Sequence, residues 1–531
     1  MRRRTTLVAV ATLPLLLLGG ALQQHASRGA DLFAQVFSLV SSKAVDTIST
    51  DAIYEKAARG LVEQLGDPYA ELMSPEELAR FSREAVAGKY GGLGMLIEDH
   101  GGRTIIARVF PNSPAERGGV FEGDEIFAVN GDTVRGESLT AVSGRLLGTP
   151  GSSVEVTFVR PGVDQPIVGR FTRQLVHMPA VPFATTLDGK IGYLPLQVFS
   201  ETSSQEVRQA LARLIREGDR GLVLDMRGNG GGSVDQAIRI ASLFLPEGSL
   251  VASVETRDSE PEVYRTEDQP VAPTLPMIVL LDGGSASATE IVSGALQDHD
   301  RAVILGSTSF GKGLVQTLYP LDGGWSLKLT TGKWLTPSGR SIQKPRKLLP
   351  DGELVEIKPD SIHPDTAARP VYHSDAGRAV YGGGAITPDV AVAPDTITTA
   401  EQQFLREIGP KSQAAYSTIF DYALQLKSQV KPDFTMQPAW RDTLYARLNS
   451  AGVKVDRKSF DAASPMLDRM LTARIAHAAF GDSIAFRRNI DTDAQLEAAL
   501  RLLREGRSQK DIFRLAERSA VAKAQAGPAG R

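Results

Sequence analysis

The sequence lacks several features that would point to common kinds of chemistry. It has no cysteine among its 531 residues, so disulfide bonds and thiol catalysis are excluded. Its formal net charge of −3 gives no basic field of the kind that attracts nucleic acid, and no nucleic-acid partner is expected. Histidine occurs only seven times and without the spacing of metal ligands, so neither a metal nor another cofactor is expected. The histidines are His25, His100, His177, His299, His363, His373 and His477.

A long membrane-spanning run is also missing, although the N-terminus has a shorter apolar run. Three arginines follow Met1, and the largely apolar stretch 7–22 comes after them. This order is typical of a secretory signal peptide, so we expect residues 1–30 to direct export to the periplasm or cell envelope. The run is short for a membrane span, yet an uncleaved membrane anchor stays open as an alternative.

The most informative segment is 281–316, which reads LDGGSASATEIVSGALQDHDRAVILGSTSFGKGLVQ. The apolar run 276–281 predicts a buried strand, and the residues after Ser287 predict a helix. Ser287 and Glu290 have the S-x-x-E spacing of a capping box, which places Ser287 at the helix N-terminus. Free N–H groups and the helix dipole at that end favour negative charge on an attacked carbonyl oxygen. Ser287 is therefore either a nucleophile or only a helix cap.

A lysine follows this serine by 25 positions, in the glycine-rich loop GSTSFGKG. Serine and lysine together can cleave amide bonds without histidine, metal or cofactor. If residues 312–316 are extended, Lys312 and Gln316 point to the same side, and the Gln316 amide oxygen could hold the lysine amine. A solvated surface lysine is the alternative, but Phe310 and two glycines give Lys312 little polar company.

Three other motifs overlap this segment and do not fit it. Gly306 to Lys312 matches the start of a phosphate-binding loop, but Gly313 stands where magnesium needs Ser or Thr, and a strand follows instead of a helix. Ser309 to Lys312 has the S-x-x-K spacing of penicillin-binding enzymes, whose S-D-N and K-T-G elements are absent. Positions 283–287 lack the last glycine of a G-x-S-x-G nucleophile elbow. The sequence therefore argues against nucleotide binding and against both hydrolase classes.

A second glycine-rich turn follows the strand-like run 220–227. Residues 228–232 read GNGGG, and a helical pattern begins near Ser233. Glycines at such a turn let backbone amides approach a ligand closely, although they also serve in plain tight turns. An oxyanion hole needs a second donor beside the amide of Ala288, and Gly231 is well placed to give it.

Together these motifs resemble those of the carboxy-terminal processing, or tail-specific, serine proteases. The resemblance rests on DMRGNGGG, GGSASATEIVSGALQD, STSFGKGLVQ and LTTGKWLTPSGRSIQ, with GLVEQLGDPYAELMSPEEL at 60–78 and ITPDV at 386–390. It covers roughly residues 35–392. The combined spacing is specific, whereas any one motif alone is not.

The resemblance assigns a role to each candidate residue. It implies that Ser287 is the nucleophile, that Lys312 is the general base and that Gln316 belongs to the same apparatus. It also implies that the amides of Gly231 and Ala288 form the oxyanion hole.

Both the pattern and the resemblance predict a peptide-binding PDZ domain over 88–176. The loop GGLGM at 91–95 would present backbone amides to the carboxylate of a substrate tail, and the edge strand after it would pair with the peptide. Relatives often carry an arginine in the turn 147–149, whereas here Arg145 lies two residues before it. A small β domain without a ligand is the alternative. The predicted peptide-binding residues are Gly92, Leu93, Gly94 and Met95.

We therefore predict an α/β fold: a crotonase-like serine protease core with an inserted PDZ domain, an N-terminal helical segment and a helical C-terminal extension. The extension has no recognisable chemistry, so we consider oligomerisation, docking on the protease body and partner binding as its uses. The predicted segments are 1–30 (signal or anchor), 31–87 (helical), 88–176 (PDZ), 177–398 (protease, with an irregular insertion at 344–385) and 399–531 (helical).

The predicted function is an exported serine endopeptidase that cleaves proteins near their C-termini with a Ser287–Lys312 dyad. Its partners would be protein substrates whose unstructured tails bind the PDZ domain, and a homo-oligomer stays open. The alternative is a non-catalytic tail-binding chaperone or scaffold, against which the intact Ser287, Lys312 and Gln316 argue.

Overall fold

The chain folds into two compact units. The first contains Met1–Leu78 with Gln316–Thr330, and the second contains Ala79–Val315 with Thr331–Arg531. The computed structural model describes residues 13–81, 89–110, 113–160, 163–257, 259–348, 354–356 and 369–525.

The first unit is built from N-terminal helices and a short sheet. Ser49 starts helix α2 (Thr50–Glu63), because its hydroxyl accepts a hydrogen bond from the Ala52 N–H at 3.3 Å. Strand β1 (Glu71–Met73) pairs antiparallel with the start of β18, and the Lys328–Glu71 ion pair of 2.6 Å joins the two strands. The other elements of this unit are α1 (Leu13–Lys43), the start of α3 (Pro75–Phe81), most of β17 (Leu314–Pro320), the 3-10 helix Asp322–Gly324 and the first half of β18 (Ser326–Leu335).

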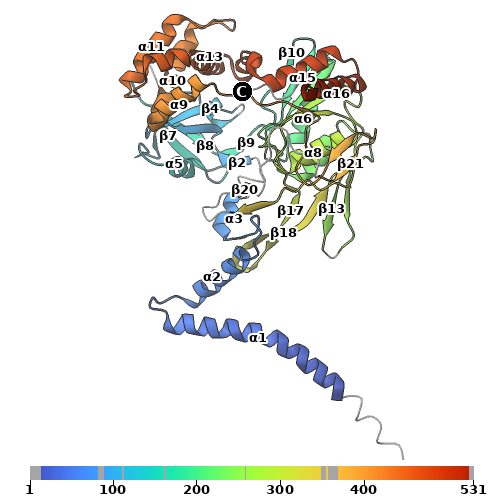
Figure 1. The fold of residues 1–531 in the computed structure, drawn as a ribbon. Coiled ribbons are helices and arrows are strands. Elements are labelled where there is room, and N and C mark those ends of the chain that lie inside the picture. Colours follow the sequence, from blue (N-terminus) through green and yellow to red (C-terminus); the bar gives the residue numbers. More distant parts are fainter. Residues whose placement is uncertain are drawn as a thin grey trace, which may run out of the picture. The chain divides into compact units, whose positions relative to one another are not determined.

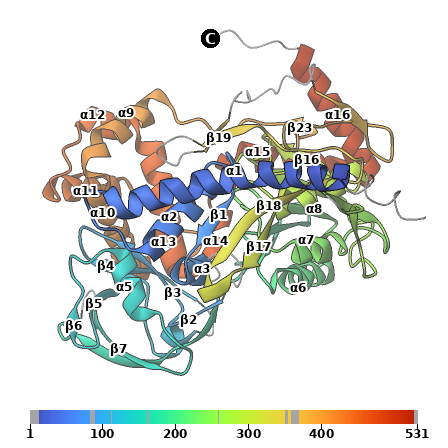
Figure 2. The same ribbon diagram turned by 90° about the horizontal axis from the view of Figure 1, so that it is seen from below.

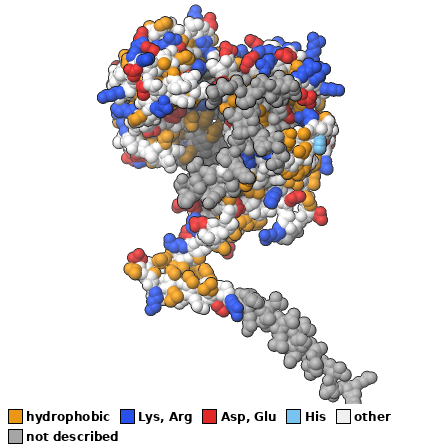
Figure 3. Space-filling view, viewed as in Figure 1, with side chains coloured by type: hydrophobic (Ala, Val, Ile, Leu, Met, Phe, Trp, Pro, Cys, Tyr) orange, Lys and Arg blue, Asp and Glu red, His pale blue; other side chains and the backbone are white. Residues whose placement is uncertain are grey.

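Helix α1 leaves apolar side chains in solvent. Figure 3 shows hydrophobic side chains gathered where α1 is followed by α2. Among helices in the described part of the chain, none combines the length and hydropathy that a bilayer span requires. Residues 1–12 of the predicted signal segment lie outside the described residues. The exposed side chains of α1 are Leu32, Phe33, Val36, Leu39 and Val40.

The second unit is organised around a six-stranded sheet of order β10-β11-β12-β15-β16-β23. All neighbouring strands are parallel except β10 and β11. Strands β12 and β15 are buried along their whole length and, apart from the terminal Asp225, carry no polar side chain, as expected for a parallel sheet that is covered on both faces. The strands are β10 (Thr185–Leu187), β11 (Ile191–Pro195), β12 (Gly221–Asp225), β15 (Met277–Leu281), β16 (Val303–Gly306) and β23 (Val390–Ala391).

Alternate residues of each central strand enter opposite cores, because strand side chains alternate with period two. Leu222 and Leu224 of β12 join the core formed with α6 (Ser203–Arg216), α7 (Val234–Ala241) and α8 (Ala288–Asp298). Val223, between them, joins the core formed with the C-terminal helices α15 (Ala494–Glu505) and α16 (Gln509–Gln525). The sheet therefore lies between two helical layers, which Figures 1 and 2 show on its opposite sides.

A smaller antiparallel sheet and two hairpins complete the protease part. Strand β13 pairs with β14 and with the second half of β18. The described part of segment 344–385, which was predicted to be largely irregular, contains two short hairpins that the sequence analysis did not anticipate. These strands are β13 (Leu250–Thr256), β14 (Glu262–Arg265), β19 (Arg346–Leu348), β20 (Leu354–Glu356), β21 (Val371–His373) and β22 (Ala379–Tyr381).

The predicted PDZ region forms a sheet of order β3-β4-β5-β7-β8 with its own apolar core. Among the described strands, β3 is at the edge of this sheet and has β4 as its partner there. Strand β2 forms a separate pair with β9. The elements are β2 (Lys89–Gly92), β3 (Met95–Asp99), β4 (Thr104–Val109), α4 (Pro114–Arg117), β5 (Glu125–Val129), β6 (Asp132–Thr133), α5 (Leu139–Leu146), β7 (Ser153–Val159), β8 (Ile167–Thr172) and β9 (Gln174–His177).

The residues after 398 are helical and divide into two groups. Helices α9 to α13 surround a separate core that includes Phe404, Leu444 and Leu467. Helices α15 and α16 pack on the catalytic sheet instead. The first group and α14 are α9 (Thr399–Ile408), α10 (Ser412–Leu426), α11 (Pro438–Ser450), α12 (Arg457–Ala462), α13 (Ser464–Phe480) and α14 (Asp482–Arg487), with 3-10 helices Gly409–Lys411, Lys427–Gln429 and Ile490–Thr492.

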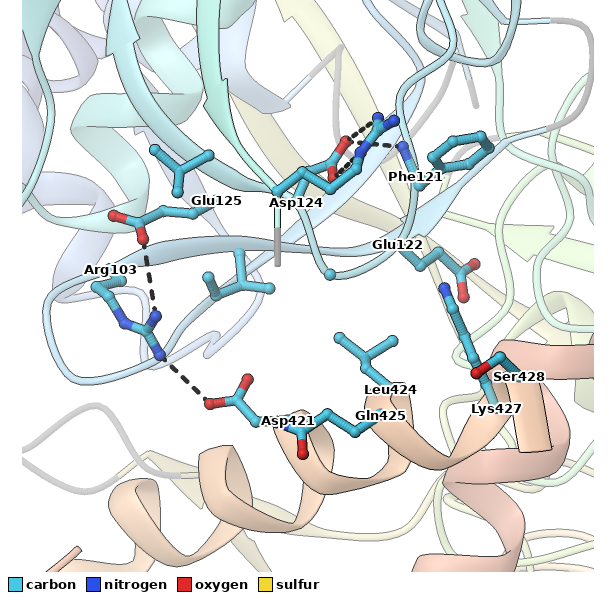
Figure 4. A pocket seen from close by; sticks show the side chains of 14 residues that line it. Arg103, Phe121, Glu122, Asp124, Glu125, Asp421, Leu424, Gln425, Lys427 and Ser428 are labelled. Atoms are coloured by element: carbon cyan, nitrogen blue, oxygen red, sulfur yellow. Dashed lines mark hydrogen bonds and ion pairs between the residues drawn. The ribbon is translucent and has the colours of Figure 1, made fainter. Parts of the chain in front are cut away.

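The PDZ region and the α9–α13 bundle meet around a cavity of about 980 Å³. Figure 4 shows Leu424 of α10 pointing into this cavity and Arg103 reaching both Glu125 and Asp421. Arg103 lies 3.7 Å from Glu125 and 3.5 Å from Asp421, so it bridges the two regions. Leu424 fits against Gly123, where a Cβ atom would lie 2.2 Å from its side chain.

Candidate active site

Ser287 occupies a strained position at the start of α8. Its backbone has φ 56° and ψ −116°, a left-handed region that residues other than glycine rarely adopt. Of the two bonds of a capping box, the one to Glu290 is formed: its carboxylate accepts the Ser287 N–H at 2.9 Å. The Ser287 side chain makes no helix-capping hydrogen bond, and the Glu290 N–H donates to the Ser287 carbonyl oxygen at 2.8 Å. Strain of this kind is concentrated at functional sites, and a serine held only as a cap has no need of it.

The sequence analysis treated Glu290 only as a capping residue, but it has a larger role in the structure. Its side chain is fully buried, and burial raises its pKa against four hydrogen bonds that lower it. Besides Ser287, it accepts the N–H of Gly311 at 2.6 Å, the N–H of Lys312 at 2.9 Å and the hydroxyl of Ser309. The S-x-x-E motif showed that Glu290 would reach back to Ser287, and nothing in the sequence showed the bonds to the lysine loop.

One carboxylate oxygen therefore joins the serine and lysine segments. The N–H groups of Ser287 and Lys312 both donate to Oε2 of Glu290, each at 2.9 Å. The two backbone nitrogens consequently lie within twice that distance of each other. The structure brings Ser287 and Lys312 together from elements that are 25 positions apart in the sequence.

Backbone contacts fix the lysine loop on its other side. The Lys312 carbonyl oxygen accepts the Trp334 indole N–H at 2.9 Å, and the Gly313 N–H donates to the Gln343 side chain at 2.8 Å. The lysine side chain is half-buried. The loop leads into strand β17 and not into a helix, so the geometry of a phosphate-binding loop is absent from this described segment.

Gln316 lies on β17 within the first unit. Its side-chain amide donates to the Thr330 hydroxyl on β18 at 3.4 Å. Strand β17 begins at Leu314, so Lys312 precedes the strand on which Gln316 lies.

The glycine-rich turn after β12 meets the start of α8. Gly231 has φ +100°, and a Cβ atom there would lie 2.9 Å from both the Ala288 nitrogen and the Ser287 Cβ. The two predicted oxyanion-hole residues, Gly231 and Ala288, are thus adjacent and lie beside the serine. The Gly231 N–H donates to Asn229 Oδ1 at 2.9 Å.

Asn229 is a second residue that sequence reasoning missed. It is fully buried, and its carbonyl oxygen accepts the Ala286 N–H at 3.0 Å and the Thr289 hydroxyl at 2.8 Å. Its side-chain amide donates to the Leu196 carbonyl at 2.8 Å. Asn229 therefore bonds the glycine turn to the serine turn, and its place inside GNGGG was the only signal of this role.

A buried ion pair anchors the far end of α8. Arg340 and Asp298 are 0% and 1% exposed, and their side chains are 2.7 Å apart. Arg340 also donates to Gln297 at 2.7 Å and to the Tyr381 carbonyl at 3.0 Å. The TPSGRSIQ motif thus holds the helix that carries the serine, a structural role that the sequence did not reveal.

The predicted peptide loop offers its backbone and not its side chains. Leu93 and Met95 are buried in the PDZ core, and Gly92 ends strand β2. Gly94 has φ +81°, and a Cβ atom there would lie 2.2 Å from the Ser113 Cβ. Met95 begins the edge strand β3, which is the geometry that strand addition of a peptide requires.

Two further side chains have structural partners. Arg145 bonds Glu137 at 2.9 Å and Asp132 at 3.2 Å on the surface. His299 is the C-cap of α8 and contacts Asp375 and the Leu250 carbonyl, each at 2.7 Å. Within the described residues, no group of three or more His, Cys, Asp or Glu side chains is arranged to hold a metal ion.

Two family models and several known proteases match parts of this chain. The model of peptidase family S41 matches residues 190–360, and a PDZ domain model matches residues 105–160. The chain is 35% identical to the carboxy-terminal-processing protease of Bartonella bacilliformis over 315 residues, 59% of this chain and 72% of that protein. It is 31% identical to the carboxy-terminal processing protease CtpA of Bacillus subtilis over 412 residues, 76% of this chain and 84% of that protein.

Among solved structures, the photosystem II D1 C-terminal processing protease is similar at 29% identity. The match covers 59% of this chain and 89% of that one, with a TM-score of 0.35. The matches to the two curated relatives confirm the resemblance that the sequence motifs indicated. The chain belongs to the carboxy-terminal processing proteases of peptidase family S41, serine proteases that here include a PDZ domain.

Proposed function

We propose that this protease cleaves peptide bonds with a dyad of Ser287 as nucleophile and Lys312 as general base. The observation that carries the proposal is the buried Glu290 carboxylate, which bonds the backbone N–H groups of both residues. The main chains of Ser287 and Lys312 are thus held at one carboxylate, which places the two residues next to each other. Gln316 would orient the lysine amine.

The chemistry begins with the lysine in its neutral form. Lys312 takes the proton from the Ser287 hydroxyl as its oxygen attacks the scissile carbonyl carbon. The resulting ammonium returns that proton to the leaving amine, and an acyl-enzyme remains on Ser287. A water molecule, deprotonated by Lys312, then attacks the ester carbonyl and releases the new C-terminus as Ser287 is reprotonated. Each proton and the acyl group are thus accounted for by Ser287, Lys312, the substrate and water.

The developing oxyanion would be held by the amides of Gly231 and Ala288. The position of Gly231 against Ser287 and Ala288 supports this assignment. The Gly231 N–H bonds the neutral Asn229 amide oxygen, and it would exchange this partner for the oxyanion during the reaction. Such an exchange is favourable because hydrogen bonds to a charged acceptor are roughly twice as strong as neutral ones.

The PDZ domain would select substrates by their C-terminal tails. The loop Gly92–Met95 would bind the terminal carboxylate, and β3 would add the tail as a further strand. We further propose that the protease core is crotonase-like, with the domain limits given by the sequence. The basic and apolar N-terminal segment supports export to the periplasm or cell envelope.

The dyad is tested by replacing Lys312 with Ala and with Arg. Both variants should lose proteolysis of casein, because neither side chain can accept the serine proton near neutral pH. Both should keep the thermal unfolding of the wild type, since the loop is held by main-chain bonds to Glu290 and Trp334. Substantial cleavage by a folded Lys312→Ala protein would contradict the dyad. The Ser287→Ala protein provides the inactive reference.

A further inference from the structure

The glycine turn beside the nucleophile begins with an arginine that is shared between the protease core and the C-terminal helices. Arg227 Nη2 donates to Asp225 Oδ2 at 2.6 Å and to Asp493 Oδ2 at 2.7 Å. Its Nη1 donates to Asp493 Oδ1 at 3.0 Å and to Gln495 Oε1 at 3.1 Å. Asp225 is at the end of β12, whereas Asp493 and Gln495 lie more than 260 positions later.

This cluster is largely withdrawn from water. The side chains of Arg227, Asp225 and Asp493 are 21%, 8% and 26% exposed. Burial alone lowers the pKa of Arg227, but its hydrogen bonds to both aspartates outweigh burial and raise it. The buried hydroxyl of Tyr193 also donates to Asp225 at 2.8 Å. Pairs that are partly desolvated and bidentate are the ones that fix geometry.

The C-terminal side of the cluster is rigidly mounted. Asp493 is the N-cap of α15 and accepts the Leu496 N–H at 2.9 Å. The buried Gln495 donates to the Val392 carbonyl at 2.8 Å. Leu496 and Leu500 of the same helix are buried in the core against the catalytic sheet. Asp493 and Gln495, the two residues of the C-terminal helical layer that contact Arg227, are therefore fixed to that sheet.

The other side of the cluster leads directly to the predicted oxyanion donor. Three residues separate Arg227 from Gly231, and the backbone around them is held by several hydrogen bonds. The Arg227 N–H donates to Asp225 at 3.0 Å, and the Gly228 N–H donates to Asp282 at 2.8 Å. Asn229 then bonds both the serine turn and the Gly231 N–H. A shift of the arginine would be transmitted to the amide that has to meet the oxyanion.

We propose that Asp493, assisted by Gln495, is a positioning residue for the oxyanion turn, acting through Arg227. The C-terminal helical layer thereby contributes to the hydrolysis itself. The inference rests on the proposed function, in which the Gly231 amide binds the oxyanion. Its physical basis is that oxyanion stabilisation requires donors that are placed before the reaction, and a small misplacement lowers the rate strongly.

The test replaces Asp493 with Asn, which keeps a good N-cap for α15 and removes only the charge. For a peptide substrate with a free C-terminus, we expect kcat to fall about tenfold and KM to stay within about twofold, because only transition-state contacts are weakened. Affinity for a peptide boronic acid, which forms a tetrahedral adduct on the serine, should fall in parallel with kcat. Asp493→Glu should have a higher kcat and a higher boronate affinity than Asp493→Asn. The thermal unfolding temperature of both variants should stay close to that of the wild type.

The matched control is Glu497→Gln on the same helix. Glu497 pairs with Arg504 at 3.3 Å on the surface and should have no effect on kcat or on boronate affinity. In a protein that already carries Arg227→Gln, Asp493→Asn should lower kcat little further, because Asp493 acts on the oxyanion turn through Arg227. If a folded Asp493→Asn protein kept the wild-type kcat and boronate affinity, this inference would be wrong and the Ser287–Lys312 dyad would be unaffected. The dyad itself would be contradicted by a different result, which is cleavage by the Lys312→Ala protein.

Discussion

Helices α9–α13 and helices α15–α16 come from one helical stretch of sequence, and their structural roles differ. The α9–α13 bundle buries its apolar side chains against one another, with Leu448 fully buried in its core. Helices α15 and α16 bury theirs against the strands of the catalytic sheet, with Leu500 at 1% exposure. The C-terminal extension is therefore not one appendage, because its last part is a layer of the protease core.

The reason for this difference lies in the sheet. Val223, Ile278 and Leu280 alternate with residues that face α6, α7 and α8, so they need a cover of their own. A parallel sheet with one apolar face in water would expose far more apolar surface than a stable domain tolerates. Among the described residues, the bundle core contains no residue of the sheet. The bundle pairs with the PDZ region through Asp421 with Arg103 and His477 with Glu122.

The largest effect is expected when a buried leucine is replaced by aspartate, once in the core between α15–α16 and the sheet and once in the core of the bundle. Leu500→Asp should abolish folding of the protease and all casein cleavage, because an unpaired charge would be buried against the catalytic sheet. Leu448→Asp should unfold the bundle and leave the sheet and the serine site formed. Casein cleavage and circular dichroism on heating measure the two outcomes.

A common outcome would contradict the division into two groups. If Leu448→Asp removed casein cleavage as completely as Leu500→Asp, the bundle would be part of the same cooperative core. The exposed Tyr416→Asp, at 46% exposure on α10, is a control for an added charge and should change neither measurement.

A smaller effect is expected at the PDZ loop, whose proposed role is to bind the substrate tail. Gly94→Val should weaken binding of a free apolar C-terminus, because the side chain would collide with Ser113 and φ is +81°. On the wild type, amidating the peptide should reduce affinity several-fold, since a charge-assisted bond is replaced by a neutral one. Equal binding and cleavage of acid and amide peptides would show that the module does not recognise the terminus.

The smallest effect concerns the contact between the bundle and the PDZ region. His477 lies 3.0 Å from Asp482 and 3.5 Å from Glu122, and Arg108 also pairs with Asp482. The hydrogen bond to Asp482 raises the pKa of His477, although burial opposes it. The stabilisation is therefore complete below the ordinary histidine pKa and is lost as pH rises through the raised value. Burial also raises the pKa of Glu122. Its contribution to stability is therefore also lost as the pH rises, but at a lower pH than that of His477.

The measurement is the free energy of unfolding at pH 6 and pH 9. His477→Gln should lower it by roughly 1 kcal/mol at pH 6, the scale of a partly exposed charge pair, and by less at pH 9. The control is His373→Gln, because His373 is exposed. This substitution should leave the free energy of unfolding almost unchanged at both pH values. A His477→Gln effect that did not depend on pH would mean that the imidazole is not charged at this contact.

Much of the candidate site could be predicted from local sequence. The apolar strands, the helix after Ser287 and the glycine turns follow from periodicity and composition, and the spacing of these motifs identified the family. Glu290, Asn229 and Asp493 could not be assigned their contacts, because hydrogen bonds between distant segments leave no periodic signal. The hairpins within 344–385 were missed because short strands there are interrupted by turn-forming residues.

By itself, the sequence determined the residue types that can perform the reaction: a serine before a helix, a lysine on a glycine loop and a glycine turn after a buried strand. Only the tertiary structure decided that one buried carboxylate holds the serine and lysine loops together. It also decided that α15 and α16 cover the sheet and that Asp493 reaches Arg227. The physical reason is that local pattern sets which face of an element is apolar, whereas packing decides which distant element covers that face.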